Sequence, residues 1–268
     1  MESKDLINEN EECKGLIDNK YILFKKEGAG LTSIAFKVKH LNDSNNLEAK
    51  VEKILNEDKL KKMNISLSKL FGHEINILNI IKNYNSPYIQ YIVNIIESGK
   101  GEIIRKNKPT STHNYIILEY AEKGCLYDYI YFPEKGFREE EYAKLLFFRI
   151  LLGIKACHEA KICNRDIKLE NILLDEKYNP KICYFGFAEI NKNEVIGEIG
   201  TQQYMATEVH KNKSYNGYQV DIFNFGVSLL IFVTGEIDFT SRMSNDNARL
   251  IYKKSHKKFW DMKMLEKH

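Results

Sequence analysis

The chain has 268 residues, of which 43% are hydrophobic and 12% aromatic, so it carries enough apolar side chains for a folded core and is not intrinsically disordered. Its 40 basic and 37 acidic residues give a net charge of +3 at pH 7. This small positive charge does not predict a surface for nucleic acid. We therefore expect one large domain, or two lobes that share a core, with a well-solvated surface.

Cysteine usage and hydropathy predict a soluble protein of the cytoplasm or nucleus. Five cysteines lack the short spacings of metal ligands, so we interpret them as reduced thiols of an intracellular protein. The N-terminal residues lack the basic and apolar regions of a secretory signal. The longest apolar stretch, residues 225–233, is too short to span a bilayer and suits a buried helix. No membrane partner is expected, and the oligomeric state is left open.

The first half of the chain has patterns that are typical of strands. Residues 1–20 are polar, and we expect them to form a loose leader. Residues 21–55 then show strand-like alternation, interrupted by a glycine turn at residues 28–30. Over residues 66–83 the apolar positions recur at helical spacing, which predicts an amphipathic helix that ends before Pro87.

Two further strands are expected in the first half, over residues 92–96 and 115–120, with a polar loop between them. The second half is richer in helical patterns. Residues 139–160 form a long helical pattern, residues 163–175 a loop that runs into a short strand, and residues 217–234 a helix that is apolar on nearly every face. A strand-rich first half and a helix-rich second half predict an α+β protein with two lobes.

One stretch of the second half combines three side chains with distinct chemistry. It runs from residue 164 to residue 174 and contains Asp166, Lys168 and Asn171 in a loop before an apolar strand. This spacing would place a carboxylate near a substrate hydroxyl, a cation near a transferred phosphate and an amide oxygen near a metal ion. The alternative is a charged loop that happens to precede a strand.

The glycine turn, which contains Gly28 and Gly30, is a weaker signal. Because glycine has no Cβ, such a turn lets backbone amides approach phosphate oxygens closely. A hairpin turn with two glycines has the same sequence, so the turn alone does not predict a phosphate site.

The loop around Asp166 resembles the catalytic loop of the protein kinase family, which reads His-Arg-Asp-x-x-x-x-Asn, and Lys168 resembles its serine/threonine branch. The resemblance extends from Tyr21 to the C-terminus. It implies a bilobal α+β fold, with a β-rich N-lobe and hinge over residues 21–120 and a helical C-lobe over residues 121–268. It also implies ATP as cofactor, magnesium held by Asn171, Asp166 and Lys168 as catalytic residues, and a protein as substrate or scaffold partner.

Further landmarks follow in the order of the family. Lys50 matches the strand lysine that binds the α and β phosphates of ATP, with Lys53 as the weaker alternative. Glu74 matches the glutamate of helix αC that pairs with this lysine, and it is expected to take part in catalysis. Without the resemblance, Glu74 would be an ordinary surface carboxylate. Asp221 resembles the residue that anchors the catalytic loop from below.

The resemblance also predicts where the nucleotide binds. Residues 117–121 resemble the hinge between the lobes, where the backbone of Glu119 and Ala121 would meet adenine, with Leu118 as gatekeeper. Together with Lys50, the residues expected to surround the nucleotide are Gly28, Gly30, Ala35, Glu119, Ala121 and Leu173. Residues 200–208 resemble the end of the activation segment.

Several positions depart from the family pattern. The family's Asp-Phe-Gly is Tyr184-Phe185-Gly186 here, and its aspartate chelates the catalytic magnesium. A phenol is neutral at pH 7 and cannot replace a carboxylate as ligand of a hard cation, so magnesium binding is expected to be weakened. Asn164 replaces the histidine that orients the catalytic loop, Thr207 replaces a proline, and Glu48 stands where a small residue usually covers the adenine.

The activation segment and the C-terminus depart as well. Between residues 185 and 200 there is no serine, threonine or tyrosine to phosphorylate. We interpret Glu194 and Glu198 first as solvated glutamates; the alternative is that one of them supplies a fixed negative charge to Arg165 as a weak substitute for a phosphate. Residues 248–260 resemble the family's helix αG region, and the helices that follow it in the family have no counterpart, so we expect an incomplete C-lobe.

These departures leave three hypotheses. The first is a pseudokinase-like domain of the serine/threonine type that binds ATP but has impaired or lost phosphoryl transfer. The second is an active but slow serine/threonine kinase that uses Asp166, Lys168 and Asn171. The third is a gene fragment without a stable fold.

Overall fold

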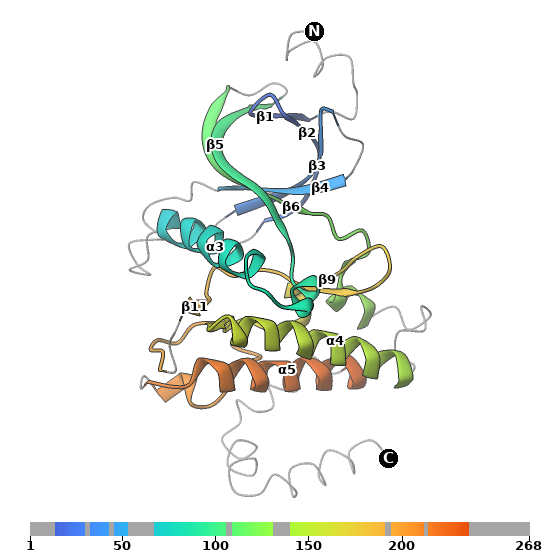
Figure 1. Cartoon of the computed structure of the whole chain (residues 1–268), viewed down its shortest axis with the longest axis vertical. Helices are drawn as coiled ribbons and strands as arrows, with labels where there is room; N and C mark the ends of the chain where they lie inside the picture. Colours follow the sequence, from blue (N-terminus) through green and yellow to red (C-terminus); the bar gives the residue numbers. More distant parts are fainter. Residues whose placement is uncertain are drawn as a thin grey trace, which may run out of the picture.

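Alternating apolar side chains in the first half of the chain form strands that close into a barrel (Figure 1). The computed structural model describes residues 14–29, 33–42, 46–52, 67–105, 109–130, 140–190, 194–211 and 214–235. Neighbouring strands are antiparallel and lie in the order β1-β2-β3-β4-β6-β5. Their bounds are Gly15–Ile17 (β1), Tyr21–Ala29 (β2), Ser33–His40 (β3), Asn46–Glu52 (β4), Ile95–Arg105 (β5) and Ser111–Glu119 (β6). Buried side chains such as Tyr21, Leu23 and Val38 form the hydrophobic core of this lobe.

The expectation of a loose leader over residues 1–20 is wrong for its last part. Gly15–Ile17 pairs with both β2 and β5 and thereby closes the barrel. Leu16 and Ile17 are 0% exposed. A Cβ at Gly15 would collide with the carbonyl oxygen of Ile104, so the close approach of β1 and β5 requires glycine there. Three residues between polar segments are too few to produce a recognisable strand pattern.

We expect Leu16→Ala combined with Ile17→Ala to destabilise this lobe strongly. Each large-to-small change in a core costs about 2–5 kcal/mol, out of roughly 5–15 kcal/mol for a whole domain. Urea denaturation, monitored by far-UV circular dichroism, measures the loss in free energy of unfolding. The control is Leu41→Ala, since Leu41 is 36% exposed in the turn after β3. An unfolding midpoint of the double variant equal to that of the control would show that β1 is not part of the core.

The hairpin of β5 and β6 is longer than the sequence indicated. Strands were expected over residues 92–96 and 115–120 with a polar loop between them, but the pairing runs from Ile95 opposite Leu118 to Ile103 opposite Ser111. The polar run of residues 97–102 is therefore strand. Glycines and charged residues have low strand propensity, so cross-strand pairing, which is not visible in a local pattern, decides the structure here.

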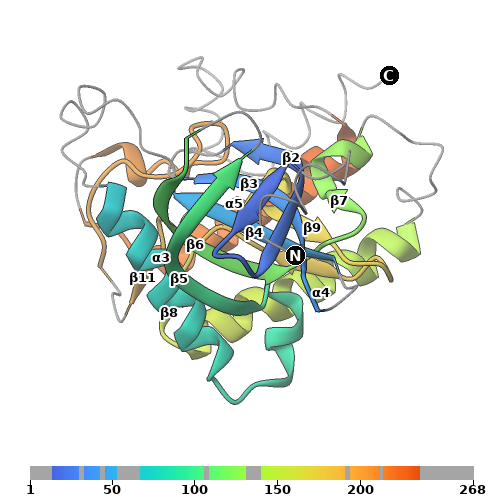
Figure 2. The same cartoon turned by 90° about the horizontal axis from the view of Figure 1, so that it is seen from above.

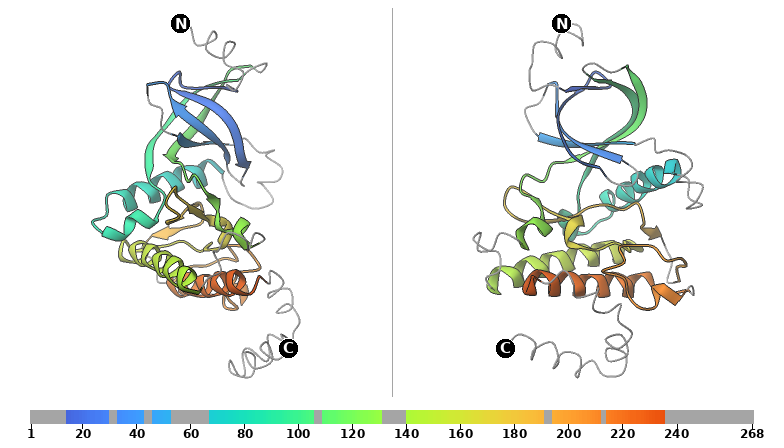
Figure 3. Two further views of the ribbon diagram at one scale, coloured as in Figure 1. Left: turned by 90° about the vertical axis from the view of Figure 1, so that its right-hand side faces the viewer. Right: turned by 180° about the vertical axis from the view of Figure 1, so that it is seen from behind.

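Helix α3 (Leu67–Lys82) agrees with the helix expected over residues 66–83. Phe71, Ile77, Leu78 and Ile81 are buried along one side, at the spacing of an amphipathic helix. The short 3-10 helix η1 (Pro87–Tyr91) follows, and the Ser86 hydroxyl caps it by accepting a hydrogen bond from the Tyr88 N–H at 3.3 Å. Helix α3 lies between the barrel and the lower lobe (Figures 1 and 3).

Two long helices form the base of the lower lobe, and both agree with their expected ranges. They are α4 (Glu140–Glu159) and α5 (Gly217–Thr234), which lie side by side (Figure 3). The ring of Phe147 lies 5.7 Å from that of Phe225 and 5.2 Å from that of Phe232. Asn216 caps the start of α5, and Gly235 ends it with a left-handed φ of 71°. No helix in the described ranges is long and apolar enough to cross a membrane.

Short strands and 3-10 helices lie between the barrel and these two helices. In the view from above, the barrel covers the short elements (Figure 2). They form two small sheets, with strand orders β10-β9-β7 and β11-β8. Their bounds are Gly124–Cys125 (β7), Ile162–Cys163 (β8), Ile172–Leu174 (β9), Pro180–Ile182 (β10) and Glu189–Ile190 (β11). The 3-10 helices are η2 (Leu126–Ile130), η4 (Leu169–Asn171) and η5 (Val209–Lys211).

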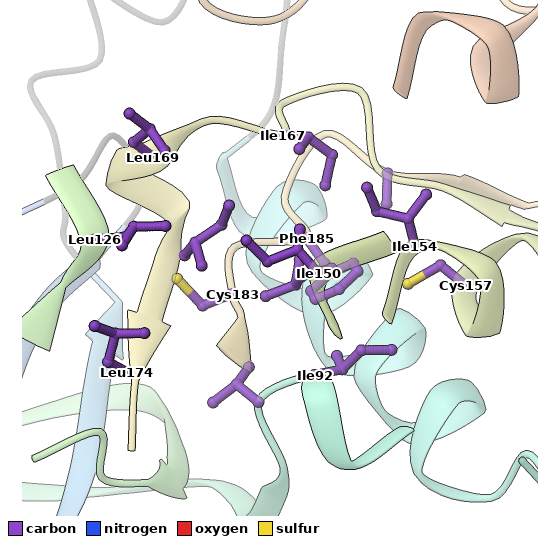
Figure 4. Packing of buried hydrophobic residues seen from close by; sticks show 14 of the residues in the cluster. Ile92, Leu126, Ile150, Ile154, Cys157, Ile167, Leu169, Leu174, Cys183 and Phe185 are labelled. Carbon is purple, nitrogen blue, oxygen red and sulfur yellow. The ribbon is translucent and has the colours of Figure 1, made fainter. Parts of the chain in front are cut away.

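One hydrophobic cluster joins the central segments of the lower lobe. Figure 4 shows Phe185, Ile150 and Ile92 packed together, although they come from three distant parts of the chain. The cluster extends from α3 to α5 and surrounds the loop that carries the candidate site. The observed architecture is thus the expected bilobal α+β fold, with a β-rich upper and a helical lower lobe. Residues 248–260, on which the expectation of an incomplete C-lobe rests, lie outside the described residues.

Candidate active site

A buried carboxylate holds the loop between β8 and η4 from below. Asp221, near the start of α5, is 0% exposed. Its Oδ2 accepts a hydrogen bond from the Asn164 backbone N–H at 2.8 Å, and its Oδ1 accepts one from the Arg165 N–H at 2.7 Å. The Nε2 of His158, at the end of α4, lies 2.8 Å from the same Oδ2. These contacts agree with the expected anchoring role of Asp221.

The three predicted residues of the loop converge on one carboxylate. Asp166 is 2% exposed. Its Oδ2 accepts a hydrogen bond from Asn171 Nδ2 at 2.8 Å and lies 3.0 Å from Lys168 Nζ. The Asn171 amide also donates to the Asp166 carbonyl at 2.9 Å, so the short 3-10 turn fixes the relative position of both side chains.

Thr201 completes this cluster, although its role could not be predicted from the sequence. Its Oγ1 donates to Asp166 Oδ1 at 2.7 Å and accepts a hydrogen bond from Lys168 Nζ at 2.6 Å. The Thr201 hydroxyl therefore contacts both side chains at once, which shows that Asp166 and Lys168 can bind a hydroxyl group between them. The sequence placed Thr201 only within residues 200–208. Its contact with Asp166 could not be predicted, because more than thirty residues separate the two along the chain.

Tyr184, whose carbonyl oxygen accepts a hydrogen bond from Asn164 Nδ2 at 3.0 Å, has its backbone in an uncommon conformation. Its φ is 65°, a left-handed value that non-glycine residues rarely adopt. The phenol ring packs edge-on against Phe187, with ring centroids 5.4 Å apart. A Cβ at Gly186 would lie 3.4 Å from the phenol ring and hydroxyl, so the side chain also lies close to Gly186. The segment therefore has an aromatic ring at the position where the family resemblance expects a carboxylate.

Helix α3 reaches the same segment through Glu74. The Glu74 carboxylate is buried, and its Oε1 accepts a long hydrogen bond from the Phe185 N–H at 3.4 Å. The neighbouring His73 Nε2 lies 2.7 Å from the Ala188 carbonyl. Glu74 is therefore not the ordinary surface carboxylate that the sequence left open as an alternative. The Lys50 side chain, its expected partner, lies outside the described side chains.

The family comparison agrees with this geometry. A family model described as "Protein kinase domain" matches residues 21–267 of the chain. The chain belongs to the protein kinase family. Its relatives are serine/threonine kinases, so it is a serine/threonine-type kinase domain.

Three relatives illustrate the similarity. The chain is 31% identical over 204 residues to serine/threonine protein kinase OSK3 of Oryza sativa subsp. indica, which covers 75% of this chain and 36% of that protein. It is 28% identical over 247 residues to CBL-interacting serine/threonine-protein kinase 13 of Arabidopsis thaliana (90% and 44%). It is 35% identical over 189 residues to SNF1-related protein kinase catalytic subunit alpha KIN12 of the same plant (70% and 34%). The matched region thus spans less than half of each relative.

Ala121 lies at the end of residues 117–121, the segment that the resemblance predicts to be the hinge. Ala121 is 8% exposed, and its backbone N–H donates no hydrogen bond to any other described residue. Its carbonyl accepts one from the Gly124 N–H at 3.1 Å. Leu118, the expected gatekeeper, is buried in β6, three residues before Ala121.

Other expected nucleotide contacts lie on both sides of the hinge. Across β2, β3 and β4, Ala35 pairs with Gly28 on one side and with Lys50 on the other. Leu173 pairs with Cys125 across β9 and β7 in the lower lobe. Burial raises the pKa of the Cys125 thiol to about 11, so it stays protonated and unreactive at neutral pH. Gly30 lies outside the described residues.

The Glu119 side chain connects the hinge to the lower lobe. Its carboxylate accepts hydrogen bonds from Lys181 Nζ, on β10, at 2.9 and 3.0 Å. It also accepts one from the Asn94 backbone N–H at 2.8 Å. This side chain was not predicted to have a role, since only the backbone of Glu119 entered the expectation. The ion pair is partly buried, with the Lys181 side chain 13% exposed and the Glu119 side chain 30% exposed, and it joins the end of β6 to β10.

The activation segment contacts Arg165 through a residue that the sequence analysis did not consider. Arg165 Nε donates to the Phe187 carbonyl at 2.7 Å, and Nη2 lies 3.4 Å from Glu189 Oε1. The alternative in which Glu194 or Glu198 contacts Arg165 is wrong, because Glu194 is exposed and Glu198 lies 2.6 Å from His210 Nδ1. Glu189 lies in β11, shortly after Phe185, and β11 pairs with β8. Glu189 therefore lies close to Arg165 in space, although the later part of the activation segment does not contribute to this contact.

The residues around Asn171 do not fit the magnesium site that protein kinases use. Both oxygens of Asp166 already contact Asn171, Lys168 and Thr201. Tyr184 adds a neutral phenol, and hard cations prefer carboxylates. Among the residues that the structure describes, no group of three His, Cys, Asp or Glu side chains could hold a metal ion. Asn171 remains as a neutral candidate ligand.

Proposed function

We propose that this kinase domain binds ATP and has impaired or lost phosphoryl transfer to serine or threonine hydroxyls of proteins. The observation that carries the proposal is the aromatic ring of Tyr184, packed on Phe187 where an active kinase holds magnesium with a carboxylate. Without this ligand, the cation that aligns the triphosphate is poorly fixed. The domain then acts chiefly as a nucleotide-binding or scaffolding module for a protein partner.

The remaining residues take the roles that their positions support. The backbone of Glu119 and Ala121 would hold adenine, and Gly28, Gly30, Ala35 and Leu173 would line the nucleotide site. Lys50, oriented by Glu74, would bind the phosphates. Asp166 would orient the hydroxyl of a protein substrate, and Lys168 would stabilise charge on the transferred group. The hydrogen-bonded cluster of Asp166, Lys168 and Thr201 supports the assignment of the last two roles.

The same cluster favours a second candidate function, a slow but active serine/threonine kinase. Asp166 is buried, Lys168 and Thr201 are partly buried, and the three side chains contact one another. Removing one preorganised electrostatic group lowers a rate by about 10²–10³, and kinases turn over at roughly 1–100 s⁻¹. The expected turnover would then be on the order of 0.001–1 s⁻¹.

We expect ATP to raise the melting temperature of the purified chain equally with magnesium and with EDTA. Nucleotide at about 100 times its Kd stabilises a protein by about 2.7 kcal/mol. The variant Lys50→Met should lose this shift, because it lacks the cation for the phosphates. Lys39→Met is the matched control, since Lys39 lies on β3 with Nζ over the ring of Phe24.

The outcomes of this thermal-shift experiment separate the three hypotheses. A shift that requires magnesium, together with measurable transfer to a basic protein, would favour the slow kinase over the pseudokinase-like domain. A cooperative melt with no shift at all would contradict ATP binding. The absence of any cooperative melt would favour the gene fragment.

A further inference from the structure

A single buried amide connects the catalytic loop to the segment that contains Tyr184. Asn164 is 1% exposed. Its Nδ2 donates to the Tyr184 carbonyl at 3.0 Å, and its Oδ1 accepts a hydrogen bond from the Asp166 backbone N–H at 3.0 Å. Its own N–H donates to Asp221. The Asn164 side chain therefore connects the two segments at the position where the family resemblance expects a histidine.

We infer that Asn164 is a positioning residue that fixes the backbone of Asp166 against that of Tyr184. The inference deepens the proposed function, because it concerns the alignment of the same site. The two contacts require one donor and one acceptor in fixed orientation, and a primary amide provides both from one planar group. Leucine has the same shape but neither group. A neutral imidazole also has one donor and one acceptor.

The backbone on both sides of the amide explains why this link matters. Arg165 has a φ of 68° and Tyr184 a φ of 65°, so each connected segment contains a non-glycine residue in the left-handed region. Such conformations persist only where the surrounding structure holds them in place. The Asn164 side chain makes one contact to the residue after Arg165 and one to Tyr184 itself. Removing the amide would therefore release both strained segments together.

Amide hydrogen exchange of the full, nucleotide-free chain tests the inference. In Asn164→Leu we expect exchange to accelerate about tenfold in residues 163–171 and 183–187, beyond any general change in α4, because a buried donor and acceptor lose their partners. In Asn164→His at pH 8, where the imidazole is neutral, we expect protection of residues 183–187 to return. If Asn164→Leu does not fold, Asn164→Ser provides the comparison, since its short hydroxyl cannot make both contacts.

Asn179→Leu is the matched control. Asn179 also donates from Nδ2, to Asp175 at 3.0 Å, and accepts from Arg149 Nη1 at 2.8 Å, but it lies in the turn between β9 and β10. Its substitution should leave the two site segments protected. Equal acceleration in both leucine variants, or no rescue by histidine, would overturn the inference. Since the measurement needs neither nucleotide nor transfer, failure of the proposed function would leave its result unchanged.

Discussion

Replacing Tyr184 by aspartate is expected to create magnesium-dependent nucleotide binding and to raise phosphoryl transfer by about 10²–10³-fold. A carboxylate at this position would supply the anionic ligand that the phenol lacks, next to Asn171. Aspartate also tolerates the left-handed φ of 65° better than tyrosine does, so the backbone should accept the change. The measurements are ATP affinity with and without magnesium, and transfer of labelled phosphate to a generic basic protein.

The chain contains a closely matched control for this substitution. Tyr178 is also a partly buried tyrosine in the left-handed region, with a φ of 60°, but it lies in the turn after β9. Tyr178→Asp should gain neither magnesium dependence nor transfer. Rapid, magnesium-dependent transfer by the unmodified chain, abolished in Asp166→Asn, would contradict the proposed function. If Tyr184→Asp itself remains inactive, the missing carboxylate is not the limiting defect.

Asp221→Ala is expected to cost about 3–5 kcal/mol of folding free energy, a large fraction of the roughly 5–15 kcal/mol available to a domain. The Asp221 carboxylate accepts hydrogen bonds from the Asn164 and Arg165 backbone N–H groups and contacts His158. In alanine these buried groups would have no partner, and each unsatisfied donor costs about 1–3 kcal/mol. The free energy of unfolding in urea measures the effect. Asp221→Asn should be intermediate, because its single carbonyl oxygen can accept only part of these bonds.

Asp175→Ala separates this effect from the loss of any backbone-capping carboxylate. The Oδ1 of Asp175 likewise accepts two backbone N–H bonds, from Lys177 at 2.9 Å and Asn179 at 2.8 Å. These groups lie in a more exposed turn, where water can replace the carboxylate, so we expect a loss of only about 1 kcal/mol. Equal destabilisation by the two alanine variants would show that burial of Asp221 is not what makes its contacts important.

Local patterns in the sequence were sufficient for much of the fold. The ranges of α3, α4 and α5 agree with periodicity alone, because the spacing of apolar side chains in a helix is set within a few turns. The same holds for the cluster of Asp166, Lys168 and Asn171, since their contacts close within six residues and a short 3-10 turn. The chemistry of the phenol at Tyr184 also follows from residue identity.

Contacts between distant segments were decided by the tertiary structure. Gly15–Ile17 becomes a strand because β2 and β5 each offer an unpaired edge to it. Thr201 reaches Asp166 because the activation segment folds over the loop, and Glu189 reaches Arg165 because β11 pairs with β8. The Asn164 amide links two strained turns that are twenty residues apart. Residue spacing records chain distance, and each of these contacts depends on distance in space.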